Sequence, residues 1–235
     1  AYGCCDLGSI NLVSHVRSAL RPDARSDSAT FRQSSAVSGC MLENVLDATV
    51  WRRKEQGIES AGKRRIGLGF LGLGDALVML GLRYDQPEGR EMASKISATL
   101  RDAAYGASVE LAKERGPFTL FDADKYLNTG LFAKRLPEKL RKDIRKHGLR
   151  NSHLLSIAPT GTISLAFADN ASNGSEPPFS WTYNRKKRRV DGTLKEYAVE
   201  DYAWRLYKHM GGDVEKLPEY FVTALEISAE AHKNM

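Results

Sequence analysis

The sequence predicts one helix-rich α/β unit, and three observations lead to this prediction. Apolar residues recur at helical spacing in several long segments. Short apolar segments bounded by glycine, proline or asparagine lie between them, and no repeat or clear linker divides the 235 residues. Hydrophobic residues make up 42% of the chain and charged residues 27%, which is ordinary globular composition. This composition excludes disordered, collagen-like and coiled-coil classes.

The N-terminal part is predicted to begin with a strand and to continue mostly as helix. The apolar segment 7–16 suits a strand end that turns into a helix, and the polar segment 21–35 indicates a loop. An amphipathic helix is expected from 36 to about 52, and a second polar loop from 55 to 65. The apolar stripe of this predicted helix consists of Val37, Met41, Val45 and Ala48, with Leu42, Leu46 and Val50 beside them.

The segment Gly67–Gly72 matches the dinucleotide-binding pattern G-x-G-x-x-G, but we reject that interpretation. The pattern should follow a hydrophobic strand, whereas this one follows the basic segment 62–65. No acidic residue about 20 positions further on ends a second apolar strand. We therefore interpret these glycines as small residues that allow close helix packing.

The middle of the chain predicts two helices with clear ends. Asp85 is a candidate cap before Pro87 and Glu88, and the helix should run to about Glu114, before Gly116-Pro117. A second helix is predicted to begin at Pro137 and to end at His147-Gly148 after several basic residues.

The C-terminal part predicts a strand, a turn, a hairpin and two helices. His153–Ala158 is short and apolar and is predicted to be a buried strand, with a helix over 163–167 and a loop over 170–178. A strand over 179–183 follows, and Asp191-Gly192 predicts a hairpin between 187–190 and 193–197. Helices are expected around 199–210 and 218–231.

Charge and cysteine content suggest a cytoplasmic protein with an anionic ligand. Lysine and arginine exceed aspartate and glutamate by 35 to 29, a net charge of +6, although an ordinary soluble surface accounts for this equally well. No run of about 18 apolar residues predicts a membrane helix, and the first residues lack a secretory pattern. Three cysteines without a spaced framework fit a reducing compartment.

The turn Pro159-Thr160-Gly161-Thr162-Ile163, between a predicted strand and a predicted helix, is the strongest candidate site. Glycine lets a ligand approach the backbone, the first-turn N–H groups point outward, and threonine hydroxyls add donors, so such a turn can bind phosphate. An ordinary capped turn is the alternative. A Walker loop is excluded because no Gly-Lys-Thr/Ser ending is present.

Two weaker candidates remain open. The basic run 185–189, beside Trp181 and Tyr183, could contact nucleic acid, but we favour a solvated hairpin. Cys5 lies among small residues and could take part in thiol exchange, or be a small buried hydrophobe. The five histidines and three cysteines show no metal-ligand spacing, so no protein-bound metal is expected.

In their order along nearly the whole chain, several segments resemble the class II, adenosylcobalamin-dependent ribonucleotide reductases. The Pro-Thr-Gly-Thr-Ile form favours class II over class I. The matching segments are 2–12 (YGCCDLGSINL), 64–69 (RRIGLG), 104–105 (AY), 111–116 (LAKERG), 150–152 (RNS), 157–164 (IAPTGTIS), 176–177 (EP) and 222–227 (VTALEI).

The resemblance implies a ten-stranded α/β barrel of two five-stranded halves and a thiyl radical mechanism that reduces ribonucleotides to 2′-deoxyribonucleotides for DNA synthesis. By resemblance, Cys5 matches the second cysteine of the reducing pair, and Pro159, Thr160, Gly161, Thr162 and Ile163 match the loop that holds the substrate phosphates. The implied cofactor is adenosylcobalamin, and the implied reductant is a thioredoxin-type protein or another dithiol.

The chain also departs from the family pattern. The Asn-x-Cys-x-Glu segment that supplies the thiyl cysteine precedes the Tyr-Gly-Cys-Cys stretch in the family and is absent here, as is the partner of Cys5. Ser175 replaces an apolar residue. We therefore expect residues 1–235 to be the second half of the barrel, truncated at both ends, and inactive without the remainder of the reductase chain.

The alternative function is a non-catalytic α/β module that binds a nucleotide or nucleic acid through Pro159–Ile163 and the basic run. Under the reductase interpretation, neither a specific nucleic acid nor a membrane is expected as a partner.

Overall fold

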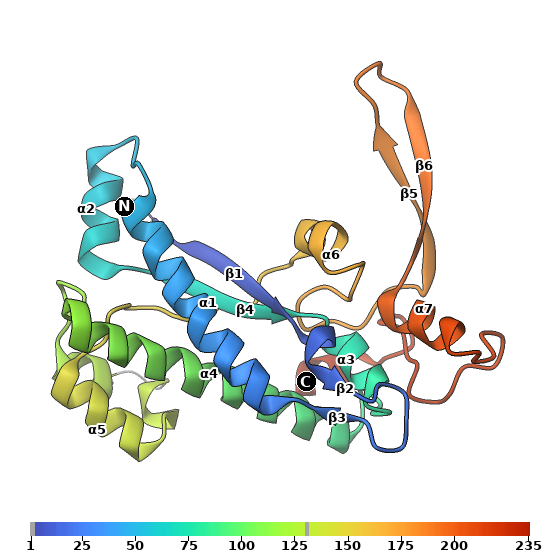
Figure 1. The fold of residues 1–235 in the computed structure, drawn as a ribbon, viewed down its shortest axis with the longest axis horizontal. Helices are drawn as coiled ribbons and strands as arrows, with labels where there is room; N and C mark the ends of the chain where they lie inside the picture. The colour runs from blue at the N-terminus through green and yellow to red at the C-terminus, as the bar shows by residue number, and fades with distance from the viewer. Residues whose placement is uncertain (1–2, 130–131) are drawn as a thin grey trace. The chain divides into compact units, whose positions relative to one another are not determined.

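A computed structural model describes residues 3–129 and 132–235, so Tyr2 of the family-like N-terminal segment lies outside the described residues. The chain divides into two compact units (Figure 1). Unit 1 comprises residues 1–10, 28–69 and 96–158, and unit 2 comprises residues 11–27, 70–95 and 159–235. Each unit is assembled from segments that are distant in the sequence.

A small sheet lies at the centre of unit 1. Strand β1 (Asp6–Asn11) pairs with β4 (Ile66–Leu71), and every residue of β4 is buried. The segment 153–156 runs parallel to β4, because the Ile66 and Leu68 N–H groups donate to the carbonyls of residues 153 and 154. The strand predicted over 153–158 is therefore present as a short parallel bridge rather than as a regular strand.

The prediction of glycine-mediated helix packing at Gly67–Gly72 is wrong, because most of this segment is strand β4. A Cβ added to Gly69 would lie 2.2 Å from the carbonyl oxygen of Ser156, so glycine is needed where two strand backbones approach. Gly72 has a different role, because it precedes α3 (Leu73–Met79) in the left-handed conformation, with φ +77°, which favours glycine.

Replacing Gly69 with alanine should destabilise the protein by about 2 kcal/mol or more, since the backbone at Ser156 would have to move. Urea unfolding measures the effect. Gly106→Ala in helix α4 is the matched control, because nothing lies within 4 Å of its added Cβ. The control should be neutral or more stable by up to about 1 kcal/mol. Equal stability of the two variants would contradict the close strand approach.

Helices cover much of unit 1, and two of them occupy segments predicted as loops. The described helices are α1 (Ser28–Ala48), α2 (Lys54–Lys63), α4 (Pro87–Arg115, which begins in unit 2), the π-helical turn Lys125–Thr129, the 3-10 turn Ala133–Arg135 and α5 (Glu138–His147). The helices predicted at 85–114 and after Pro137 are confirmed. The loop predictions for 28–35 and 55–63 are wrong, because polar composition hid local helix stabilisation such as the Glu59–Lys63 pair at 2.6 Å.

Helix α1 has two apolar faces, and only one is buried in the described structure. Leu42 and Leu46 are about 5% and 4% exposed, whereas Val37, Met41 and Val45 of the predicted stripe are exposed. The buried face is completed by residues that the apolar pattern did not include. These are Phe31, Ser35, Gly39 and Glu43.

Unit 2 packs around the short helix α3. Its other elements are the 3-10 turn Leu12–His15, β2 (Val16–Arg17), β3 (Arg25–Ser26), α6 (Gly161–Phe167), β5 (Thr182–Arg188), β6 (Leu194–Glu200), α7 (Tyr202–His209) and α8 (Ala229–Asn234). The buried core brings together Val13, Leu71, Val78, Ala203 and Phe221. Apolar residues from all three sequence segments of unit 2 thus form its core.

The predicted hairpin is confirmed, with β5 and β6 antiparallel around Asp191-Gly192. The preceding strand begins at Thr182 rather than at 179, and α7 begins at Tyr202 because Asp201 caps it. The helix predicted over 218–231 is wrong, since only Ala229–Asn234 is helical. Turns at 218–226, closed in part by Glu226 accepting from the Thr223 N–H, replace the rest.

The helix-rich α/β class is confirmed. The described strands form three two-stranded sheets, and they do not close into a barrel. No helix within the described ranges is long and apolar enough to cross a membrane.

Candidate functional site

The predicted phosphate turn leads into helix α6 in unit 2. Thr160 precedes the helix in the left-handed conformation, with φ +57°. Its hydroxyl is buried and accepts a hydrogen bond from the Gly174 N–H at 2.9 Å, and its carbonyl accepts from the Ser164 N–H at 2.8 Å. The side chain of Thr160 therefore fixes the turn, which is a structural role that the sequence did not reveal.

The outward groups of this turn are free. Among the described residues, no acceptor is recorded for the N–H groups of Gly161, Thr162 and Ile163, and the side chain of Thr162 is exposed. Unpaired first-turn N–H groups bind water or an anionic oxygen. The amides are thus not consumed by ordinary backbone pairing, and the turn can accept a phosphate oxygen.

Cys5 lies in unit 1, at the start of β1. Its side chain is exposed, and its Sγ lies 3.6 Å from the position that a Cβ would take at Gly67. The same position is 2.9 Å from the Cβ of Ser156, so Cys5 lies beside the segment that leads towards residue 159. Cys4 is buried, and its Sγ donates to the Gln56 carbonyl at 3.5 Å. Only the second of the two adjacent thiols is accessible.

Both thiols favour the protonated form at neutral pH. Burial raises the pKa of Cys5, the Asp6 carboxylate adds to the increase, and Arg65 opposes it. Burial also raises the pKa of Cys4, followed by the charge of Glu59. An accessible, protonated thiol suits hydrogen donation better than thiolate attack. The two halves of the predicted site belong to different units, with Cys5 in unit 1 and Pro159–Ile163 in unit 2.

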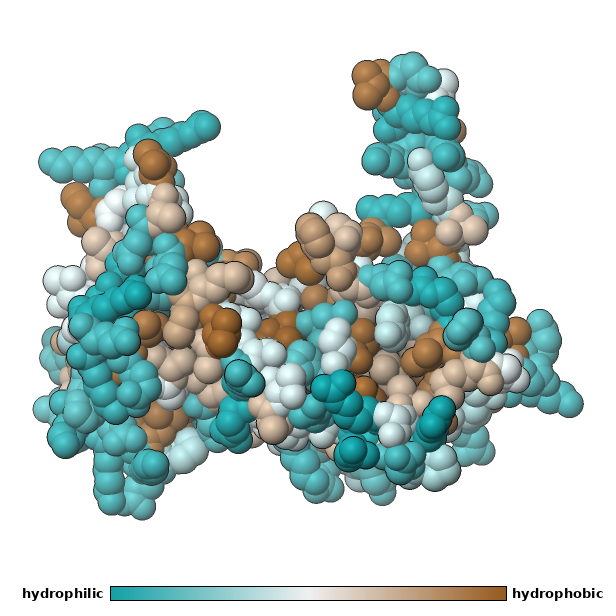
Figure 2. Space-filling model, viewed as in Figure 1, coloured by the Kyte–Doolittle hydropathy of each residue, from teal (hydrophilic) through white to brown (hydrophobic). Residues whose placement is uncertain are grey.

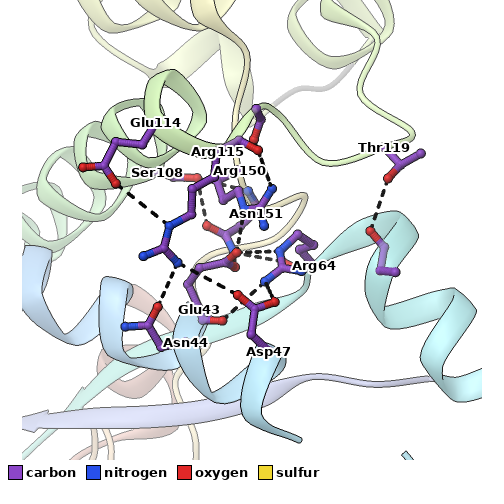
Figure 3. Close-up of polar contacts among 12 residues, drawn as sticks. Glu43, Asn44, Asp47, Arg64, Ser108, Glu114, Arg115, Thr119, Arg150 and Asn151 are labelled. Carbon is purple, nitrogen blue, oxygen red and sulfur yellow. Dashed lines mark hydrogen bonds and ion pairs between the residues drawn. The ribbon is translucent and has the colours of Figure 1, made fainter.

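Three segments of unit 1 meet at the fully buried carboxylate of Glu43 on α1 (Figure 3). Its oxygens accept from Arg64 Nε at 2.5 Å, Arg150 Nε at 2.6 Å and Asn151 Nδ2 at 2.5 Å. Asn151 is held in turn by Ser108 of α4, whose hydroxyl donates to Asn151 Oδ1 at 2.9 Å. Three of the family-like residues, Arg64, Arg150 and Asn151, therefore organise this unit.

Unit 2 contains a buried pair of carboxyl groups that the sequence analysis missed. Asp75 of α3 and Asp201, the cap of α7, are 0% and 2% exposed. Burial and then the charge of Asp201 raise the pKa of Asp75 well above its usual range, and burial raises the pKa of Asp201 to about 6. An acidic residue inside the apolar segment 73–80 was the available sign of this pair.

A cavity of moderate size is found in each unit. A cavity of about 250 Å³ in unit 2 is bordered by Asn170–Asn173, Glu176–Ser180, Tyr183 and Asp201. A cavity of about 460 Å³ in unit 1 is bordered by aromatic residues and by the segment 152–155. Pockets of these volumes suit small ligands. Neither is large enough to enclose a corrin, and no group of three or more His, Cys, Asp or Glu with metal-binding geometry occurs among the described residues.

The fold is that of a helix-rich α/β protein in which the turn before α6 has first-turn amides with no recorded acceptor among the described residues. A family model described as the ribonucleotide reductase barrel domain matches residues 1–235. The chain belongs to this family.

Known relatives carry reductase names. The chain is 33% identical over 184 residues to the vitamin B12-dependent ribonucleoside-diphosphate reductase of Mycobacterium tuberculosis, covering 78% of this chain and 23% of the relative. It is 28% identical to the reductase subunit alpha of Chlamydia muridarum, covering 96% and 24%. It is also 28% identical to the vitamin B12-dependent enzyme of Thermoplasma acidophilum, covering 98% and 29%. The chain thus spans about a quarter of the length of these relatives.

Proposed function

We propose that this chain is part of the catalytic barrel of an adenosylcobalamin-dependent ribonucleotide reductase. The observation that supports this most is the family match over residues 1–235, together with free amides at the turn that resembles the family's phosphate loop. Within this proposal, residues 1–235 form the second half of a ten-stranded barrel, and the strands that close it come from the remainder of the reductase chain.

Two features favour the cobalamin-dependent class. Relatives from Mycobacterium tuberculosis and Thermoplasma acidophilum are named vitamin B12-dependent. The turn also has the Pro-Thr-Gly-Thr-Ile form of that class. When bound, adenosylcobalamin supplies the radical that starts the reaction. We assign none of the cofactor's contacts to numbered residues of this chain.

The turn Pro159–Ile163 is proposed to hold the substrate phosphates. No acceptor among the described residues is recorded for the N–H groups of Gly161, Thr162 and Ile163, and the exposed Thr162 hydroxyl adds a donor. The buried bond between Thr160 and Gly174 keeps these donors in place. The names of the relatives favour a ribonucleoside diphosphate as substrate.

Cys5 is proposed to be one of the two cysteines that reduce the sugar. Two thiols give up two electrons and two protons and become a disulfide, while the ribose 2′ oxygen leaves as water. The partner thiol lies elsewhere in the intact enzyme, and a dithiol such as a thioredoxin-type protein reduces the disulfide again. The exposure and the raised pKa of Cys5 suit this role.

A chimeric enzyme tests the proposal. This chain replaces the matching segment of the Mycobacterium tuberculosis relative, and deoxynucleotide formation is measured with adenosylcobalamin and a dithiol. Cys5→Ser should lower turnover by at least about a hundredfold, since the disulfide cannot form. Thr162→Val should instead raise KM for the nucleotide by roughly tenfold, because one phosphate donor is lost.

Cys40→Ser is the matched control, because this partly buried thiol on α1 has no role in the proposal. Circular dichroism shows whether each chimera is folded. Full turnover by a folded Cys5→Ser chimera would refute the assignment. The 235-residue chain alone should form no deoxynucleotide, and detectable product from it would contradict the proposed dependence on the remaining chain.

A further inference from the structure

The β5–β6 hairpin of unit 2 is a two-stranded ribbon without protein covering most of its length. All of β5 and residues 194–198 of β6 are exposed. Figure 1 shows the ribbon extending beyond α6 and α7, and Figure 2 shows hydrophilic side chains along it with a hydrophobic group near its tip. Isolated two-stranded ribbons are marginally stable in water, so a partner that covers this one would stabilise it.

The register of the hairpin sorts its charges onto one side. Residues directly opposite each other in an antiparallel pair share a face. Arg185 lies opposite Tyr197 and Lys187 opposite Lys195, and the Arg189 N–H donates to the residue 193 carbonyl at 2.8 Å, which continues the register. We call this side the cationic face. It comprises Tyr183, Arg185, Lys187, Arg189, Thr193, Lys195, Tyr197 and Val199, and it carries no acidic residue.

The opposite side, which we call the mixed face, is electrically balanced. Lys186 lies opposite Glu196, and their Nζ and Oε1 atoms form an ion pair at 3.1 Å. Arg188 lies opposite Leu194, and Glu200 at the other end pairs with Lys208 of α7 at 3.0 Å. The cationic face therefore carries four basic residues and no carboxylate, three of them from the basic run. The mixed face carries two basic residues and two carboxylates.

The charges on the cationic face repel one another when no partner covers it. Lys187 and Lys195 are like charges directly opposite each other, which destabilises a ribbon. No ion pair is recorded for Arg185, Lys187 or Arg189 in residues 3–129 and 132–235. Lys195 Nζ instead lies 4.5 Å from the centre of the Tyr197 ring. A polyanion on this face would offset the repulsion.

We propose that the cationic face binds nucleic acid without sequence preference. Arg185, Lys187 and Arg189 recur at every second residue and would each meet a phosphate, as would Lys195 across the ribbon. The Tyr197 ring offers a surface on which a base of a single strand stacks. The face has no Asn or Gln side chain to read an adenine edge, and the hairpin's asparagine, Asn184, lies on the mixed face. This inference is independent of the reductase proposal.

Two double variants of the 235-residue chain test it. Lys187→Gln with Arg189→Gln alters the cationic face, and Lys186→Gln with Arg188→Gln alters the mixed face, so each removes one lysine and one arginine from neighbouring positions. Binding to a fluorescent oligo-dT of about 15 nucleotides is followed by anisotropy between 50 and 200 mM salt.

The cationic-face variant should bind roughly tenfold more weakly near 150 mM salt. The slope of log K against log salt should fall by about 1.4, the value for two lost phosphate contacts to a single strand. The mixed-face variant should bind within about twofold of the unaltered chain. Equal weakening by both variants, or the absence of salt-dependent binding by the unaltered chain, would overturn the proposal.

Two further arms distinguish the kind of anion. Tyr197→Leu should weaken oligo-dT binding at least about fivefold and leave binding to a duplex of the same length unchanged, because stacked bases are accessible only in the single strand. A polyglutamate of matched charge should bind much more weakly than oligo-dT. Tight polyglutamate binding that depends on the cationic face would replace nucleic acid with an acidic polypeptide as the partner.

Discussion

Glu43→Ala is expected to destabilise the protein by about 3–5 kcal/mol, the largest effect of any substitution considered. The change removes the carboxylate that accepts from Arg64, Arg150 and Asn151. Two guanidinium groups with side chains only 11% and 14% exposed would then lie without their shared counter-charge. Urea denaturation followed by circular dichroism measures the loss.

The matched control lies one turn further along α1. Asp47 also pairs with Arg64, at 2.7 Å, but its side chain is 50% exposed. Because water screens this pair, Asp47→Ala should cost less than about 1 kcal/mol. Glu43→Gln keeps an acceptor without the charge and should fall between the two. A cost for Glu43→Ala no larger than that for Asp47→Ala would contradict the central role of the buried carboxylate.

Asp75→Asn is expected to make the protein more stable than the unaltered chain at alkaline pH, by at least about 1 kcal/mol, roughly the equivalent of one pKa unit. Burial and the neighbouring Asp201 raise the pKa of Asp75 well above its usual range, and burial raises that of Asp201 to about 6. Asparagine keeps a carbonyl to accept from the Ser172 N–H, which Asp75 Oδ2 does at 3.1 Å. It also removes a buried carboxyl group that the folded chain holds protonated at a pH where the unfolded chain would release the proton.

The sign of the pH dependence follows from proton binding. In the unfolded chain both aspartates lose their protons near pH 3.9. The folded chain keeps them to higher pH, so the free energy of unfolding decreases as pH rises from about 4 through 6 and beyond. Stability contributed by this pair is fully present below about pH 4 and lost above the folded pKa values. The difference between Asp75→Asn and the unaltered chain should therefore be small near pH 4 and increase with pH.

Thermal unfolding measured from pH 4 to pH 8 provides the comparison. Asp213→Asn removes an exposed carboxylate from the same unit and should show no such increase. If Asp75→Asn remains parallel to the unaltered chain across this range, the two carboxyl groups do not share a proton in the folded state.

Elements with strong local determinants were predictable from the sequence. The proline and acid at 87–88 set the start of α4, and Asp191-Gly192 set the hairpin and its register. Asp85, the predicted cap, instead accepts from Arg83 Nε at 2.7 Å. Elements defined by tertiary contacts were not. Strand β4 is apolar throughout and glycine-rich, so its strand character depends on the pairing with β1 and on the close approach of Ser156.

The candidate site shows the same division. The position of the turn at Pro159 was predictable, since proline, glycine and threonines are adjacent in the sequence, and α6 begins at Gly161. Phosphate binding by this turn stays a prediction. The buried hydrogen bond from the Gly174 N–H to the Thr160 hydroxyl was not predictable, because it joins residues whose proximity the fold creates. Glu43 was equally hidden, since a single carboxylate on a helix is usually exposed and its three partners lie in other segments.

The Glu43 network also has a consequence for synthesis on the ribosome. Its bond to Asn151 joins residues separated by 108 positions. At ordinary translation rates, the ribosome needs on the order of 5–20 s to add the residues that separate them. During that interval the helix carrying Glu43 is present without Arg150 and Asn151, so the part of its carboxylate that they will contact has to remain hydrated. Unit 1 can therefore complete its folding only after the segment with Asn151 has left the ribosome, and chaperones that bind nascent chains have a defined period in which to act on it.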